Sequence, residues 1–575
     1  MFNKLKLMWV VSCTLLLLPI SNLMGNENSD QTLRVAAQFF SAQGGDLASL
    51  DPARRGTWSF HSLLWAPLVW TDTAGNPDPQ KSIAESWEAT NNNKTFTFKI
   101  RKDAKYSDGS LITAKDIALS WGYYGMMVHK EARGYRDNYG TGRRLYPDIV
   151  GFMEFTKKVP YKEFEAGKLG DISGIEVIDQ STLVINFSKP AGNFIRRLTG
   201  FAPFNPTDLK VGIDRKLPQK DYWPAHAKHT GPYRIESSKP GQSYVMVPNE
   251  YYFGPKPKIE RIEVLAVSED INTIIAAFEN KELDLVAIPL KGDFARQAVA
   301  NDYLKNSLVE MPMWQVEQYW LTPNKPLDDR YVRRAFTMAI NRQAIVNILN
   351  AGSPVKLYET VNMHRNPNIP NCVKETKEVT ILKYDPEMAM TELKKSKYWP
   401  EVQNMEINIY PGSPDNVARG EVVKKMLEDN LGLKKVKVRI EKVKNRNKPP
   451  FPFHFWNNTQ QPWYSDITDT LQNMVFLMKD KEWKDSDPRG FVTVAYEPNL
   501  RNLVERAMSE QDEGERCNLV GQSGQEWNDV AFSIDYAIPA AYFLKSPKVK
   551  GELDWYKNAA QGKPQNIENW IVSDN

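Results

Sequence analysis

Apolar and polar positions change their spacing along the chain in a way that predicts alternating strands and helices. Residues 95–100 alternate apolar and polar side chains, which predicts a strand with one buried face. The asparagines at 91–93 predict a turn before it, because asparagine tolerates left-handed backbone angles. Residues 108–109 (Asp-Gly) predict a second turn, and Thr113 with Asp116 predicts a helix whose first turn both side chains cap.

The same mixture continues toward the C-terminus. Residues 174–187 predict two strands around a turn, and residues 271–289 predict a helix, a polar break and a strand. Residues 328–349 carry apolar side chains at helical spacing, and residues 385–400 predict a helix with proline in its first turn. No tandem repeat and no long linker is present, so we predict an α/β fold with mixed sheets and domains that can be interleaved.

The first 25 residues have the pattern of a secretory signal peptide. Lys4 and Lys6 precede an apolar run at residues 7–20, and small and polar residues follow it. The run is shorter than a membrane-spanning helix requires. Cys13 lies inside the run rather than after it, so we expect export with removal of residues 1–25 and no lipid anchor.

Composition adds size and charge to this picture. A chain of 575 residues is too long for one core and predicts three or four domain-sized units. The chain contains 16 Trp, 24 Tyr and 24 Phe, many in polar surroundings, which suits ligand clefts as well as cores. Loss of Lys4 and Lys6 lowers the formal net charge of +4 by two, and such a near-neutral balance gives no support for nucleic-acid binding.

The search for catalytic chemistry finds no complete motif. The sequence has no GxSxG, HExxH or P-loop motif, and its acidic residues show no spacing that singles out a catalytic pair. His226 and His229 lie three residues apart, but two histidines do not complete a metal site. We therefore expect a protein that is not an enzyme and that holds neither a metal nor a cofactor.

Two cysteines, Cys372 and Cys517, lie outside the expected signal peptide. An exported protein can form disulfides. However, the sequences around these two cysteines share no pattern that would bring them together. The sequence alone does not show whether they pair, and the lack of a shared pattern favours two unpaired cysteines.

Several short motifs occur in the order in which one protein family has them. The most specific are residues 84–87 (Ala-Glu-Ser-Trp), 106–109 (Tyr-Ser-Asp-Gly) and 113–116 (Thr-Ala-Lys-Asp). Weaker pieces follow at residues 229–235, 249–264, 324–345, 384–398 and 535–543. On these motifs the chain resembles the bacterial extracellular solute-binding proteins of family 5, the peptide- and nickel-binding class that serves ABC importers.

The resemblance implies an α/β, two-lobed periplasmic-binding-protein (Venus-flytrap) fold with an extra satellite domain. Its implied units are lobe I at 26–70, 175–290 and 531–575, the satellite domain at 71–174, and lobe II at 291–530. The stretch at 91–121 would be scaffold in the satellite domain, away from the cleft. A ligand would close the lobes, and the closed form would dock on the membrane permease subunits of an ABC transporter. The resemblance also implies a periplasmic monomer.

The family's peptide-binding members pair the amine of the peptide with a carboxylate in a Trp-x-x-Asp-Tyr segment. The corresponding stretch here is 455–474, where an ungapped alignment puts Trp463 in place of that aspartate. The anchor would then be absent or replaced by Asp466. An insertion would instead align Trp456 with the family tryptophan and move Asn457 into the site.

Residues 317–324 resemble the strand beside the hinge, which makes Tyr319 and Trp320 candidates for the cleft, with a place in the core as the equal alternative. The ligand-binding candidates are Tyr319, Trp320, Trp456, Asn457, Trp463 and Asp466. An oligopeptide receptor is the leading hypothesis. A receptor of the same fold for an oligosaccharide or another non-peptide ligand remains open, because tryptophan also suits a sugar face. An exported hydrolase would require a catalytic cluster that the sequence does not reveal.

Overall fold

The computed structural model of the chain describes most of the predicted elements. The described residues are 31–37, 63–72, 76–126, 148–158, 172–198, 201–205, 207–208, 227–239, 242–266, 271–290, 298, 300–312, 316–322, 324–350, 357–359, 372, 375, 378–412, 416–441, 452, 454–460, 497–553 and 566–573. The expected signal peptide at 1–25 lies outside them. In the part that is described, no helix combines the length and the apolar character needed to cross a bilayer.

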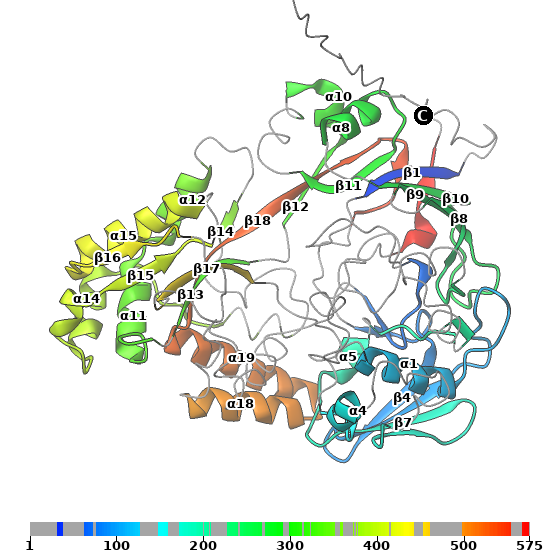
Figure 1. Cartoon of the computed structure of the whole chain (residues 1–575), viewed down its shortest axis with the longest axis horizontal. Helices are drawn as coiled ribbons and strands as arrows, with labels where there is room; N and C mark the ends of the chain where they lie inside the picture. Colours follow the sequence, from blue (N-terminus) through cyan, green and yellow to red (C-terminus); the bar gives the residue numbers. More distant parts are fainter. Residues whose placement is uncertain are drawn as a thin grey trace, which may run out of the picture.

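A twelve-stranded mixed sheet runs through the molecule (Figure 1). Its strand order is β16-β15-β17-β13-β18-β11-β1-β10-β9-β8, and β12 and β14 also pair with β18. The strands are β1 (Thr32–Ala37), β8 (Tyr233–Lys239), β9 (Ser243–Pro248), β10 (Arg261–Ala266), β11 (Leu285–Leu290), β12 (Leu308–Pro312), β13 (Val316–Leu321), β14 (Leu357–Glu359), β15 (Ile407–Tyr410), β16 (Val436–Val438), β17 (Phe455–Gln460) and β18 (Ser533–Lys545).

Strand β18 is shared by two halves of the molecule. Its first part pairs with β13 and β14, and its second part pairs with β12 and β11. Figure 1 shows it crossing from one half to the other. We call the side with β1 and β8–β12 the first half and the side with β13–β17 the second half.

The first half includes a separate four-stranded sheet, the satellite sheet, with the order β4-β5-β7-β6. Its strands are β4 (Ala84–Thr90), β5 (Thr95–Ile100), β6 (Ile175–Val177) and β7 (Thr182–Asn186), and its helices are α1 (Ala114–Met126), α4 (Phe152–Lys158) and α5 (Phe194–Arg197). From sequence we expected the satellite domain to end at residue 174. The structure corrects this boundary, because β6 and β7 pair into the satellite sheet and not into the large one. The β6–β7 prediction itself is confirmed.

The opening module folds as its pattern predicts. In β5 the apolar residues are buried, and Asn91, Asn92 and Asn93 have φ angles of 53°, 53° and 57°. Thr113 and Asp116 cap α1 reciprocally, since each backbone N–H donates to the other residue's side chain, at 2.9 and 3.3 Å. Local spacing alone was sufficient for these features.

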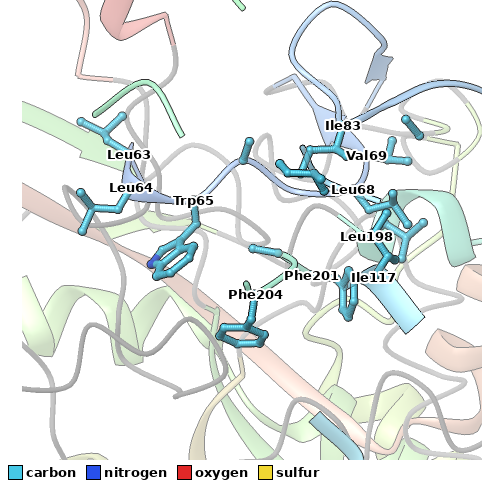
Figure 2. Close-up of a cluster of buried hydrophobic side chains, with 14 of the residues drawn as sticks. Leu63, Leu64, Trp65, Leu68, Val69, Ile83, Ile117, Leu198, Phe201 and Phe204 are labelled. Carbon is cyan, nitrogen blue, oxygen red and sulfur yellow. The ribbon is translucent and has the colours of Figure 1, made fainter. Parts of the chain in front are cut away.

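One buried cluster joins the satellite sheet to the rest of the first half. Figure 2 shows its centre, where the segment at 63–69 packs against residues from several elements: Ile83, Ile117, Leu198, Phe201 and Phe204. Trp121 of α1 stacks on Phe201 at 3.9 Å between ring centroids. The same cluster continues to Leu33 of β1 and Phe543 of β18. The satellite and β1 therefore share a core and do not form independent bodies.

A second layer covers the outer face of the first half. Helices α8 (Ile271–Glu279) and α10 (Asp302–Ser307) pack their apolar residues against β11 and the second part of β18. The predicted helix and strand at 271–289 are thereby confirmed as α8 and β11. The polar break between them contains Lys281, whose φ is 63°.

The second half places helices on both faces of its part of the sheet. On one face lie α11 (Arg330–Ala339), α12 (Arg342–Asn350), α14 (Pro386–Lys394) and α15 (Val417–Leu431), and on the other lie α18 (Pro498–Ser509) and α19 (Glu513–Val530). The helical segment predicted at 328–349 is two helices, because Ile340 adopts extended backbone angles between them. The predicted α14 is confirmed, with Asp385 as its N-cap.

Candidate functional site

Strands β13, β17 and β18 lie next to one another where the two halves meet in the sheet. Tyr319 of β13 pairs with Asn457 of β17 on one side and with Ile534 of β18 on the other. Two sequence-predicted ligand residues, Tyr319 and Asn457, thus occupy directly opposed positions beside the shared strand.

A polar network connects Asn457 to groups that the sequence analysis missed, and Tyr319 packs against it. The Tyr536 hydroxyl donates to Asn457 Oδ1 at 2.7 Å and accepts from Arg419 Nη1 at 2.9 Å. Arg419 Nη1 also donates to Glu317 Oε2 at 3.0 Å. Tyr319 packs on Tyr536 with 5.7 Å between ring centroids. We call these five residues the Arg419 cluster.

Burial governs the charge state of the Arg419 cluster. Burial raises the pKa of Tyr536 far above its ordinary value, and the nearby Glu317 carboxylate raises it further. Burial also raises the pKa of Tyr319. For Arg419, burial lowers the pKa, but Tyr536 and Glu317 outweigh that effect and leave it raised. At neutral pH the cluster therefore contains two neutral phenols and the ion pair between Arg419 and Glu317.

Two donors of this cluster are left over. Among the described residues, neither Arg419 Nε nor the Tyr319 hydroxyl has a hydrogen-bond partner, although both atoms are buried. Buried polar groups are normally satisfied, so unpaired ones in a native structure call for an explanation. Both atoms are donors, and both are enclosed by the core of the second half.

The other predicted ligand residues are placed differently. Trp320 points to the opposite face of the sheet, where it is buried against Trp527 at 5.7 Å between ring centroids. Trp456 is opposite Trp320 in the register of β17, and only its backbone is described. Trp463 and Asp466 lie outside the described residues. The structure therefore brings together Tyr319 and Asn457, and the wall at 456–466 stays a prediction.

No sequence signal points to the missed members of the cluster. Glu317 and Arg419 are 102 residues apart, and Asn457 and Tyr536 are 79 apart. Glu317 did fall within the segment that resembles the strand beside the hinge, but a single glutamate at a strand end does not identify its partner. Pairing of this kind is visible only after the sheet has formed.

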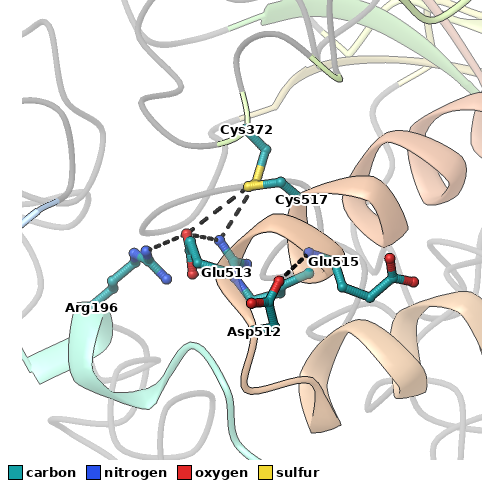
Figure 3. Close-up of a disulfide and its surroundings, with 7 residues drawn as sticks. Arg196, Cys372, Asp512, Glu513, Glu515 and Cys517 are labelled. Carbon is teal, nitrogen blue, oxygen red and sulfur yellow. Dashed lines mark hydrogen bonds and ion pairs between the residues drawn. A yellow bond between two sulfur atoms is a disulfide. The ribbon is translucent and has the colours of Figure 1, made fainter.

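The two cysteines form a disulfide, contrary to the expectation from sequence (Figure 3). Cys372 and Cys517 are separated by 145 residues, and the packing of α19 brings them together. Arg516 and Glu513, one helical turn or less from Cys517, contact the bonded sulfur atoms, and Arg196 of α5 reaches Glu513. Cys372, Cys517 and Glu513 place three potential ligand atoms near one another. However, the bonded sulfurs are not thiolates, which are the form that binds metals.

Comparison with known proteins places this architecture in a family. The family model described as "Bacterial extracellular solute-binding proteins, family 5 Middle" matches residues 78–484. The oligopeptide-binding protein OppA of Bacillus subtilis is 23% identical over 494 residues, which cover 83% of this chain and 81% of that protein. The nickel-binding periplasmic protein of Escherichia coli is 25% identical over 366 residues, covering 61% and 59% respectively.

A solved structure agrees with the fold. The periplasmic murein tripeptide-binding protein MppA, in its unliganded open form, matches with a TM-score of 0.70 and 17% identity. The match covers 94% of this chain and 97% of that one. All three of these proteins are named as binding proteins, for oligopeptides, nickel and a murein tripeptide. The chain belongs to the bacterial extracellular solute-binding proteins of family 5 and has their two-lobed α/β fold.

Proposed function

We propose that the protein is exported to the periplasm, captures an oligopeptide between its two lobes and delivers it to the permease subunits of an ABC importer. The observation that carries this proposal is β18, a single strand paired into both halves of the large sheet. A strand that both lobes share can bend or twist while its pairing is kept. Membership of family 5 supports the transport role.

An extended peptide suits a site beside strands β13 and β17. Peptide receptors commonly bind the ligand main chain through hydrogen bonds and accept varied side chains in pockets. Arg419 Nε and the Tyr319 hydroxyl are donors beside these strands, but both atoms are buried, so a peptide carbonyl would reach them only where the surrounding core opens. Glu317 already balances the charge of Arg419, so the cluster contributes directed donors and little net charge.

Thermal unfolding with defined ligands tests this function. Peptides of two to nine residues and oligosaccharides of similar length are added separately to the purified protein. A ligand at 100 times its dissociation constant should raise the free energy of unfolding by about 2.7 kcal/mol. Stabilisation by peptides and not by sugars supports the proposal. Stabilisation by sugars alone, or hydrolysis of an added peptide, contradicts it.

An oligosaccharide or another non-peptide solute is the second candidate. The stretch at 456–466 contains two tryptophans and lacks the aspartate at the family position, and relatives include a nickel-binding protein. Asp466→Asn separates the candidates. If Asp466 pairs with a free peptide amine, the change should weaken binding by about 2–5 kcal/mol, because the amine is left buried and unpaired. A neutral sugar would lose much less, since an amide still forms hydrogen bonds.

Export and the ligand wall have direct tests as well. N-terminal sequencing of the protein recovered from the periplasm should begin close to residue 26, and a retained Met1 would contradict the signal peptide. Trp463→Ala should weaken solute binding tenfold or more without changing the melting temperature of the unliganded protein. Unchanged affinity would remove this tryptophan from the site.

A further inference from the structure

The two halves touch each other at a second place, away from β18. Helix α19 is 18 residues long, so its first turn lies about 27 Å from the end that leads into β18. At that far end the helix follows the turn Glu510–Asp512, which connects it to α18. In Figure 1 this turn lies beside α5 of the satellite.

The satellite caps the C-terminal end of α18. The last carbonyls of a helix lack donors from the helix itself and need partners from elsewhere. Here the Gly192 N–H donates to the Met508 carbonyl at 2.9 Å. Asn93 Nδ2 donates to the carbonyls of Ser509 at 3.4 Å and Glu510 at 3.0 Å. Groups of one half therefore satisfy the backbone of the other.

The hairpin that presents Asn93 has an uncommon backbone conformation. Three successive asparagines adopt left-handed angles, which non-glycine residues seldom adopt and which asparagine tolerates better than most. Asn91 and Asn92 are exposed, whereas Asn93 is 6% exposed and directs its carboxamide to the α18 carbonyls. The left-handed turn thus coincides with a contact between the halves.

The backbones of Gly192 and Met508 approach each other so closely that glycine is required. A Cβ atom at this position would lie 2.7 Å from the Met508 carbonyl oxygen, closer than real Cβ contacts. Only a residue without a side chain allows the two backbones to meet at this distance. The close fit shows that the surfaces are matched to each other at this point.

An ion pair extends the contact to α19. Arg196 Nη2 lies 3.0 Å from Glu513 Oε1, and Arg516 binds both carboxylate oxygens of Glu513 at 3.0 Å (Figure 3). Cys517, one turn further, is bonded to Cys372. The disulfide therefore tethers the start of α19 to Cys372 through Cys517, four residues after the carboxylate that Arg196 reaches.

We propose that Asn93, Gly192 and Arg196 form a latch that grips the end of α18 and the first turn of α19 and holds the two halves together opposite β18. The latch sets the balance between open and closed forms without touching the solute. Its contacts are polar, and a hollow of about 450 Å³ lies beside them, so water can replace them readily. The inference rests on the proposed clamp.

The test compares the shape of latch variants in the absence of any solute. The variants are Asn93→Gly, Arg196→Gln and their combination, with Asn91→Gly as the matched control. Both glycine substitutions relieve a left-handed asparagine, but only Asn93→Gly removes a contact with α18. Each lost contact should shift the ratio of open to closed molecules by about fivefold. Small-angle X-ray scattering should therefore give a larger radius of gyration for the double variant than for the control.

The melting temperature and circular dichroism of each variant verify that it is folded. If the double variant melts early, the single variants are compared, and each should still exceed the control in radius. An unchanged radius in folded variants overturns the latch. Because no ligand is used, this result is independent of the peptide-binding test. If the protein failed to bind peptides, an increased radius of gyration in the latch variants would still support the latch.

Discussion

The two connections between the halves differ in chemistry. Strand β18 pairs with four other strands, and its residues enter the buried clusters of both halves: Ile534, Ile538, Phe543 and Leu544. The latch consists of three hydrogen bonds and an ion pair whose Glu513 carboxylate is 58% exposed. The packing of β18 removes apolar surface from water. The latch replaces hydrogen bonds to water with hydrogen bonds between protein groups.

This difference predicts which of the two connections can open. Separating buried apolar surface costs about 25 cal/mol per Å². Exposed ion pairs typically contribute about 0–1 kcal/mol, and water restores much of what a polar contact loses. We therefore expect β18 to stay paired in every functional state while the latch opens and closes. The following predictions test this contrast.

The largest effect is expected in β18. Phe543 is fully buried in the cluster that joins β18 to the first half. Phe543→Ala should lower the free energy of unfolding by about 3–5 kcal/mol, because it removes apolar contacts and leaves a cavity. Urea denaturation measures the loss, with Phe543→Leu as the milder control. A loss below about 1 kcal/mol would mean that this strand is not a permanent connection.

Removing the disulfide should have the next largest effect. The Cys372→Ser/Cys517→Ser variant should lose about 2–4 kcal/mol of stability, since the bond closes a loop of 145 residues in the unfolded chain. The first turn of α19 would also lose its anchor, so the radius of gyration should rise as in the latch variants. Thiol titration of the oxidised protein should find both cysteines unreactive, and reactive thiols would count against the bond.

The Arg419 cluster allows a matched pair of variants to be compared beside β18. Tyr536→Phe removes a hydroxyl that bonds Asn457 and Arg419, which should cost about 1–3 kcal/mol of stability. Tyr319→Phe removes a buried hydroxyl without a partner among the described residues, so stability should be unchanged or slightly higher. If Tyr319 donates to the solute, this second variant should instead bind the solute more weakly. Equal losses of stability in both variants would contradict the finding that the Tyr536 hydroxyl is hydrogen-bonded and the Tyr319 hydroxyl is not.

The smallest effect is the response of the latch to pH. Burial acts to raise the pKa of Glu513, but Arg516 of α19 and Arg196 of α5 outweigh it and hold the pKa below 4.5. The disulfide at Cys517 also faces this carboxylate and does not titrate. The contact is therefore complete above pH 4.5 and is lost as the pH falls through the lower folded value.

Scattering at decreasing pH measures this response while circular dichroism confirms the native fold. The radius of gyration should rise on acidification, and Glu513→Gln should remove the rise because it has no charge to lose. Arg196→Lys should retain part of the response. A rise of the same size in Glu513→Gln would assign the response to other groups.

Sequence by itself determined the local elements and the family. The strand at 95–100, the left-handed asparagine turn and the cap at Thr113 depend on residues a few positions apart, so spacing and side-chain type suffice. The family motifs also lie in such short stretches. From them followed the two-lobed α/β fold and the candidates Tyr319 and Asn457, which meet beside β18.

Only the tertiary structure decided the contacts between distant segments. It placed β6 and β7 in the satellite sheet, bonded Cys372 to Cys517, and assembled the Arg419 cluster. It also decided that Tyr319 and not Trp320 faces that cluster, because strand alternation separates the two side chains but does not say which face packs where. These outcomes depend on which surfaces pack together across the whole chain, and a local pattern carries no record of its partner many residues away.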